Sequence, residues 1–325
     1  MNHYTLPSRL SRLRRTAQSR ALLRETRLHS ENFIAPLFVS DVITTAKSIH
    51  AMPGQFQLSL DCLPREIEEL SALGIPAVLL FGIPQQKDAC GSQSFHSDGI
   101  IQKAIKKIRS VNKDILIITD LCFCEYTDHG HCGVLDNERI HTDKTLDLLG
   151  QQAISHAKAG ADWVAPSGMT DGMVTALRSA LDSQGYSHVP ILSYSAKYCS
   201  SLYGPFREAA EGAPLFGDRK AYQMDPANSE EALRETALDI EEGADMIMVK
   251  PAGFYLDIIS KLKTNFPEIP LCAYQVSGEY SMIKCAAAQG LINEQQVMLE
   301  SLIAIKRAGA DFIISYFAKD IARLL

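Results

Sequence analysis

The sequence contains no apolar run that approaches the roughly 20 residues of a membrane-spanning helix. Its formal net charge of -6 provides no whole-molecule basic field to hold nucleic acid. The N-terminus lacks the apolar core of a secretory signal, and eight cysteines in 325 residues do not form a small disulfide framework. These absences predict a soluble cytoplasmic protein in a reducing compartment, with no nucleic-acid or membrane partner.

The first 30 residues carry seven arginines and almost no acid, whereas the remainder has the composition of a globular protein with a sizeable core. We therefore expect a basic N-terminal arm over residues 1–30 and a single catalytic domain over residues 31–325. An organelle transit peptide is the alternative for the arm, although Pro7 and the polar interruptions disfavour the helix that such a peptide forms. A disordered basic tail is the simplest alternative.

Eight apolar, β-rich runs recur along the chain, each separated from the next by a helical pattern. Near-continuous hydrophobicity, rather than alternation, indicates strands buried on both faces of a parallel sheet. Eight such units predict an α/β fold of the (β/α)8 TIM barrel type with an extended N-terminal arm. The expected strands cover residues 33–39, 76–81, 115–120, 162–167, 191–197, 245–250, 271–277 and 311–317.

A short Gly-Ala-Asp repeat supports the barrel. It occurs at residues 160–162, 243–245 and 309–311, and residues 73–76 form a degenerate fourth copy. Each copy ends a predicted helix at a glycine and opens an even-numbered strand, as a barrel of four double units requires. A doubly wound open sheet is the alternative, but no Gly-x-Gly-x-x-Gly follows the first strand.

Two lysines end consecutive strands of this pattern. Lys197 closes the fifth strand and Lys250 closes the sixth. Adjacent strands lie about 4.8 Å apart, so both amines can reach one pocket at the end where barrel enzymes place their chemistry. Burial and a second cation both favour the neutral amine, which is the nucleophile of Schiff-base chemistry. The alternative is that each lysine simply reaches solvent or a carboxylate.

A cysteine-rich loop follows the third strand. Cys122 and Cys124 alternate along an extended segment, and a turn at Gly130 lets Cys132 fold back onto them. Three thiolates predict a zinc site, and three ligands leave a position open for water or substrate, as in catalytic zinc sites. A closed structural site that uses His129 or His131 is the alternative. We expect most of the other five cysteines to be small buried hydrophobic residues.

The same segments resemble the porphobilinogen synthase family, also called 5-aminolevulinate dehydratase. The resemblance covers nearly the whole chain, from residue 33 onward together with the arginine-rich arm. The motifs that carry it, in order, are residues 120–133 around the cysteines, 193–198 around Lys197, 203–210, 217–220, 248–253 around Lys250, 274–280 and 307–311.

The resemblance implies a hydro-lyase that condenses two 5-aminolevulinate molecules to porphobilinogen with loss of two waters, in tetrapyrrole and heme biosynthesis. It implies that Lys250 holds the first substrate as a Schiff base and that Lys197 engages the second beside the zinc. The implied substrate contacts are Arg207 and Lys220 on the carboxylate of the second substrate, and Ser277 and Tyr316 on the first substrate. The position of Asp120 beside Cys122 adds a further candidate contact, which would steer the substrate amine or transfer protons; a strand-end hydrogen bonder is the alternative.

The resemblance also implies a regulatory magnesium at Glu235, for which an exposed helix carboxylate is the alternative, and a homo-octamer wrapped by the arm. Residues 167–173 read Ser-Gly-Met-Thr-Asp-Gly-Met, where the family usually has Ser-Asp-Met-Met-Asp-Gly-Arg. Contacts at Gly168, Thr170 and Met173 therefore cannot be transferred from the family. Two rival functions are a metal-free lysine aldolase on the same barrel and a non-catalytic zinc-holding scaffold.

Overall fold

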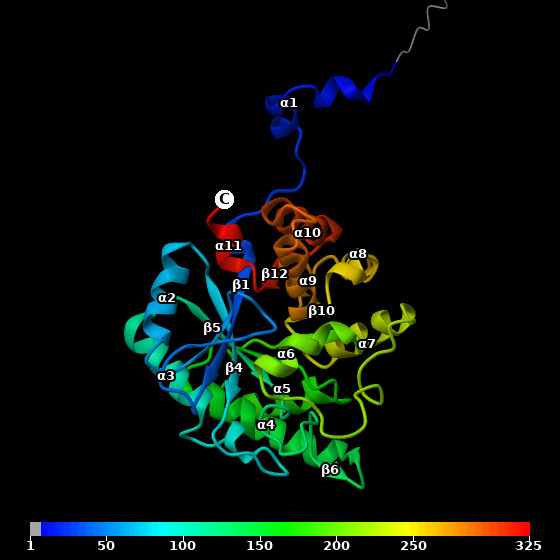
Figure 1. Cartoon of the computed structure of the whole chain (residues 1–325). Coiled ribbons are helices and arrows are strands. Elements are labelled where there is room, and N and C mark those ends of the chain that lie inside the picture. The colour runs from blue at the N-terminus through cyan, green and yellow to red at the C-terminus, as the bar shows by residue number, and fades with distance from the viewer. Residues whose placement is uncertain (1–7) are drawn as a thin grey trace, which may run out of the picture.

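The computed structural model describes residues 8–325. Its central feature is a set of eight parallel strands, and Figure 1 shows helices around the strands. Each of the eight predicted strands is present, with bounds that differ from prediction by at most two residues. The strands are β1 (Phe33–Ser40), β4 (Ala77–Ile83), β5 (Leu116–Leu121), β8 (Trp163–Pro166), β9 (Leu192–Lys197), β10 (Met246–Lys250), β11 (Leu271–Gln275) and β12 (Phe312–Ser315).

The order of the strands closes the ring. Pairing runs β8-β5-β4-β1-β12-β11-β10-β9. The two ends of this path meet where Val164 of β8 forms a parallel bridge to Ile191, which precedes β9. The Val164 N–H also donates to the carbonyl of Pro190 at 3.1 Å. The fold is therefore the predicted TIM-like barrel, and the open doubly wound sheet is excluded.

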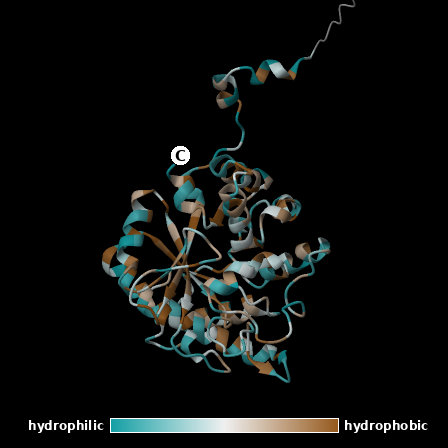
Figure 2. Ribbon diagram, in the orientation of Figure 1, coloured by the Kyte–Doolittle hydropathy of each residue, from teal (hydrophilic) through white to brown (hydrophobic). Residues whose placement is uncertain are grey.

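Helices cover the outside of the strands, and Figure 2 shows apolar residues along the strands and mixed polarity along the helices. In α3, for example, Ile101, Ile105 and Ile108 are buried at a spacing of three or four residues, which is one face of a helix. The main covering helices are α2 (Leu63–Ala72), α3 (Ile100–Val111), α4 (Thr142–Ala159), α5 (Met173–Ser183), α7 (Glu230–Glu241), α8 (Leu256–Asn265), α9 (Ser277–Ala288), α10 (Glu294–Ala308) and α11 (Ala318–Ala322).

The Gly-Ala-Asp repeat has a double role at the amino-terminal end of the strands. Its glycines take positive φ at the helix ends, with 107° at Gly160, for example. Each aspartate then accepts the backbone N–H at the beginning of a neighbouring strand. Asp162 bonds Ile117 at 2.7 Å, and Asp245 and Asp311 bond Ile191 and Leu271, each at 2.8 Å. The repeat therefore satisfies strand donors that the ladder leaves without a partner.

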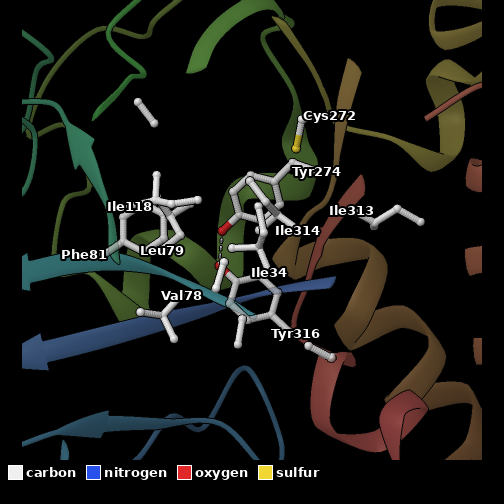
Figure 3. Close-up of a cluster of buried hydrophobic side chains, with 14 of the residues drawn as sticks. Ile34, Val78, Leu79, Phe81, Ile118, Cys272, Tyr274, Ile313, Ile314 and Tyr316 are labelled. Atoms are coloured by element: carbon white, nitrogen blue, oxygen red, sulfur yellow. Dashed lines mark hydrogen bonds between the residues drawn. The ribbon is translucent and has the colours of Figure 1, made fainter. Parts of the chain in front are cut away.

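The barrel interior is filled by side chains from several strands, so the barrel is a packed core (Figure 3). Tyr274 of β11 and Tyr316, directly after β12, point toward one another there, and their hydroxyls are 2.9 Å apart. Ile34, Val78 and Ile118 pack around the pair.

The remaining elements lie in the connections and at the N-terminus. The loop after β5 carries the hairpin β6 (Leu135–Asp136) and β7 (Arg139–Ile140), and the loop after β9 carries η4 (Ser201–Tyr203) and α6 (Gly204–Ala209). The short helices η1 (Leu10–Arg14) and α1 (Ala17–Leu22) extend away from the barrel (Figure 1). Smaller elements are η2 (Ser30–Asn32), β2 (Lys47–Ser48), β3 (Phe56–Leu58), η3 (Ser92–Ser94) and η5 (Gly253–Tyr255).

No helix within residues 8–325 combines the length and the apolarity that crossing a bilayer requires.

Candidate active site at the carboxyl ends of the strands

The two strand-end lysines are direct neighbours. Lys197 and Lys250 are register partners at the carboxyl ends of β9 and β10, and both line one small cavity. Their side chains are 5% and 4% exposed, so neither amine reaches bulk solvent. The two lysines therefore share one buried mouth of the barrel, as the strand pattern predicts.

Lys250 lies within a group of aromatic rings. Its Nζ is 4.1 Å from the ring centre of Tyr274 and between 5.0 and 5.5 Å from those of Tyr194, Phe206 and Tyr203. Burial, and after it the positive charge of Lys197, lower the pKa of Lys250 to about 7. Near neutral pH a large fraction of this side chain is therefore the free amine, which is the nucleophilic form.

Lys197 is held by a different set of groups. Its Nζ donates to the carbonyl of Ser167, the residue that follows β8, and it lies 5.5 Å from the ring centre of Tyr194. The Ser167 hydroxyl donates in turn to Asp120 Oδ2 at 3.0 Å. Burial, and then the charge of Glu125, raise the pKa of Asp120 to about 7. Asp120 is therefore placed beside both lysines, in an environment suited to proton transfer.

The cysteine loop places three sulfurs together. The Sγ atoms of Cys122, Cys124 and Cys132 all lie within 4.8 Å of one another, and all three side chains are buried. The turn that returns Cys132 to the pair passes through Gly130 at φ 72°, where a Cβ would lie only 2.2 Å from the carbonyl oxygen of Ala213. Only glycine fits this turn without displacing the neighbouring backbone.

The histidines of this loop have other partners. His131 binds the Tyr222 hydroxyl through Nδ1 at 3.2 Å and the Phe216 carbonyl through Nε2 at 3.1 Å. In His129, Nδ1 accepts the His131 backbone N–H at 3.1 Å and Nε2 lies 3.3 Å from the Ala89 carbonyl. With both rings engaged in this way, the geometry favours the three-cysteine set over the closed site that includes histidine.

The chemistry of the donor set fits a zinc ion. Hydrogen bonds from Cys122 and Cys124 lower the pKa of Cys132, so one thiolate is already favoured within the cluster. Three thiolates are soft ligands that select zinc over magnesium or calcium. A set of three protein ligands leaves one tetrahedral position free, which is typical of catalytic rather than structural zinc.

The four other predicted substrate contacts differ in their placement. Arg207 lines the cavity with both lysines. The Ser277 hydroxyl accepts the Phe206 N–H at 2.9 Å, and the Tyr316 hydroxyl lies against Tyr274. Lys220 does not line the cavity: its side chain is 76% exposed and faces Asp218 at 3.6 Å.

Two buried residues near Lys220 were not predicted as site residues from the sequence. Arg219 lines the cavity and is 5% exposed, and its guanidinium donates to the carbonyls of Gly130 and Gly212. Gln223 is 3% exposed, and within residues 8–325 neither polar atom of its amide group has a hydrogen-bond partner. The motif at 217–220 was the available signal for Arg219, but the direction of each side chain in a loop does not follow from sequence.

The mouth is covered by α6. Phe206 and Arg207 of this helix lie over the two lysines, and the enclosed cavity measures only about 20 Å³, close to the space of one water molecule. This space is smaller than the five-carbon substrate that the family resemblance predicts. The long connection at 198–227, which carries α6, is the segment whose movement could admit it.

Glu235 lies outside this mouth, on α7. The alternative that it is simply an exposed helix carboxylate is wrong, because the side chain is half-buried and lines a separate acidic cavity of about 930 Å³. Burial, followed by the charges of Asp171 and Asp239, raises the pKa of Glu235. The cavity forms between α7 and the segments at 169–173 and 227–229, so the burial of Glu235 depends on tertiary packing that periodicity within α7 does not reveal.

Comparison with known proteins gives one consistent result. Residues 7–324 match the family model described as delta-aminolevulinic acid dehydratase. Proteins of that name from Halalkalibacterium halodurans and Bacillus subtilis are 54% and 52% identical, over 97% and 98% of this chain and 95% and 98% of their own lengths. The Toxoplasma gondii delta-aminolevulinic acid dehydratase (porphobilinogen synthase), solved in complex with the reaction product porphobilinogen, is 42% identical with a TM-score of 0.95. That alignment covers 98% of this chain and 92% of the other.

Proposed function

Because this chain belongs to the delta-aminolevulinic acid dehydratase family, it is a hydro-lyase of 5-aminolevulinate, and we propose that Lys250 and Lys197 carry its chemistry. The reaction joins two substrate molecules into porphobilinogen with loss of two waters. The observation that supports this assignment is the register pairing of two buried lysines at one barrel mouth.

Lys250 is proposed to hold the first substrate as a Schiff base. Its nitrogen forms a bond to the ketone carbon, and the ketone oxygen leaves as water. Burial excludes solvent and, together with the charge of Lys197, favours the free amine that begins this step. Ser277 and Tyr316, which lie on the β11 and β12 side of the mouth, are proposed to hydrogen-bond the first substrate.

Lys197 is proposed to engage the second substrate beside the three cysteines. Cys122, Cys124 and Cys132 would hold zinc, which when bound supplies a Lewis acid for the substrate oxygen. Asp120 lies between the sulfur cluster and the lysines, where its carboxyl can accept or return a proton. Two substrates held in different orientations gain the proximity that free solution lacks.

The long loop after β9, which includes α6, is proposed to bind the carboxylate of the second substrate. Arg207 and Arg219 both line the cavity, and a guanidinium suits a carboxylate through paired N–H donors. Lys220 would join them only after the loop rearranges, because its side chain faces solvent with the mouth closed. This arrangement links carboxylate binding to closure of α6 over the lysines.

Borohydride trapping with 5-aminolevulinate, followed by peptide mass mapping, tests the proposal. Hydride adds to the imine carbon and converts the Schiff base into a stable secondary amine. We expect the label at Lys250. Labelled protein without label at Lys250 would refute this assignment.

Two activity measurements on the purified enzyme distinguish this function from the two rival functions. A metal-free aldolase would keep its rate after chelation, whereas this enzyme should lose activity and regain it with added zinc. A zinc-holding scaffold would lose no activity when Lys250 is replaced by alanine, whereas the enzyme should lose turnover completely.

Three further assignments complete the proposal: a magnesium ion at Glu235, a homo-octamer and a cytoplasmic location. The acidic cavity around Glu235 offers oxygen ligands of the kind that magnesium prefers.

Residues 8–30 extend from the barrel with their arginines exposed, which suits an arm that docks on a neighbouring copy, with residues 31–325 as the catalytic domain. Light scattering of the full chain, with and without magnesium, tests assembly size and its dependence on the ion.

A further inference from the structure

Glu279 is a buried carboxylate that the proposed chemistry does not use. It is the third residue of α9 and is 6% exposed. A carboxylate taken out of water is costly unless hydrogen bonds replace its hydration. The partners of Glu279 therefore show what its position supports.

Among the residues that the structure describes, the donors to the Glu279 carboxylate are all backbone N–H groups, and they come from two segments of the active site. Its Oε1 accepts the Gly253 N–H at 2.5 Å, and its Oε2 accepts the N–H groups of Val276 at 2.7 Å and Ala252 at 3.4 Å. Ala252 and Gly253 belong to the turn that leaves Lys250. Val276 immediately precedes Ser277, at the beginning of α9.

Gly253 shows how closely the carboxylate approaches this turn. A Cβ built on Gly253 would lie 2.4 Å from Glu279 Oε1, well inside contact distance. The glycine is therefore required by the approach of the carboxylate to the backbone. Both residues take part in one contact between the turn after β10 and α9.

We propose that Glu279 is a positioning residue for the reaction, whose carboxylate fixes the turn after Lys250 relative to the helix start that carries Ser277. The inference rests on the proposed role of Lys250 as the Schiff-base lysine. Because the hydrogen bonds of the Glu279 carboxylate are to backbone N–H groups and not to the Lys250 amine, it acts through the backbone.

The chemistry of the contact explains why a carboxylate is required. All three partners donate, so both oxygens must accept. In Glu279→Gln, one oxygen becomes an amide NH2 group, and a donor then faces a donor at Gly253 or at Val276 and Ala252. The turn must shift to relieve this conflict, and Lys250 moves with it. A misplacement of about 1 Å in a catalytic group can cost roughly 100-fold in rate.

The test uses the full-length zinc-loaded enzyme and 4-oxopentanoate, a ketoacid without the substrate amine. Borohydride trapping over time, with peptide mapping, gives separate rates of imine formation at Lys250 and Lys197. For Glu279→Gln we expect the Lys250 rate to fall by about 100-fold, the Lys197 rate to stay within about threefold, and the zinc content to stay unchanged. Gly253→Ala should give the same selective loss, since its Cβ displaces the carboxylate.

Asp245→Asn is the matched control. Asp245 also accepts a backbone N–H, from Ile191 at 2.8 Å, but it lies at the opposite end of the strand that carries Lys250. This variant should keep both imine rates. The inference is overturned if Glu279→Gln and Gly253→Ala trap at Lys250 like the unmodified enzyme, or if rates at both lysines and zinc content fall together. Absence of label from Lys250 in the unmodified enzyme would instead refute the proposed function.

Discussion

The low pKa of Lys250 should depend measurably on its cationic neighbour. Burial is the first cause of the shift to about 7, and the charge of Lys197 is the second. Lys197→Met keeps the length and apolar stem of the side chain but removes the charge. The pKa of Lys250 should therefore rise in this variant, because the ammonium form no longer meets a like charge.

The size of the shift follows from Coulomb's law. The lysines are register partners on strands about 4.8 Å apart, so we place the charges at about 6 Å. With an effective dielectric constant of about 20, the repulsion is about 3 kcal/mol, or about 2 pKa units. Nearby Asp120 offsets part of the charge of Lys197, so we expect a rise of about 1 to 2 units.

The assay is the pH dependence of imine formation between 4-oxopentanoate and Lys250, again read by borohydride trapping and peptide mapping. Only the free amine reacts, so the rate should increase with pH through a midpoint near 7 and then level off. In Lys197→Met the midpoint should move to about 8 to 9. Lys261→Met, which removes a surface lysine paired with Glu230, should leave it unchanged. An unchanged or lower midpoint in Lys197→Met would refute the electrostatic argument.

Lys250→Met should abolish turnover yet raise the free energy of unfolding at pH 6 by a few kcal/mol in denaturant titrations. The reason is that a lysine pKa held near 7 instead of 10.5 costs the folded state about 1.4 kcal/mol per pKa unit. This gain in stability should shrink as the pH rises from 7 toward 10.5. Cys124→Ser should weaken zinc binding by roughly 100-fold or more in a competition titration with a chelator. Cys285→Ser, at an exposed cysteine, should not. Asp311→Asn weakens the bonds to the Leu271 N–H and Lys263 and should cost about 1 to 2 kcal/mol of stability without changing imine rates. Gly168→Ala should add about 0.4 to 1 kcal/mol of stability, since its Cβ meets no atom closer than 3.5 Å and its φ is not in the left-handed region.

The pattern of apolar residues along the chain predicted most of the fold. Strands buried on both faces have an apolar signature that does not depend on their partners, so all eight were found. Lys197 and Lys250 could be placed together because a strand end fixes where its last side chain lies. The three cysteines could be placed together because alternation and one glycine turn determine the geometry locally.

Side-chain direction in loops and helix packing were not available from the sequence. Lys220 and Arg219 are adjacent, and only the folded loop determines that Arg219 turns inward while Lys220 faces solvent. Glu235 appears as a surface carboxylate within its own helix, and its half-burial becomes visible only when residues 169–173 and 227–229 fold beside α7. The aromatic surroundings of Lys250 come from four separate elements, β9, η4, α6 and β11.

The two ends of the barrel illustrate opposite uses of charge. At the amino-terminal ends of the strands, Asp162, Asp245 and Asp311 accept strand N–H groups, so each charge there stabilises the fold. At the carboxyl ends, Lys197 and Lys250 are buried as neighbours, and their mutual repulsion destabilises the fold while it frees an amine for attack. Variants at the first end should therefore lose stability and keep chemistry, and Lys250→Met should do the reverse. A barrel in which both kinds of variant lost stability would show that the lysine pair is a structural feature rather than a reactive one.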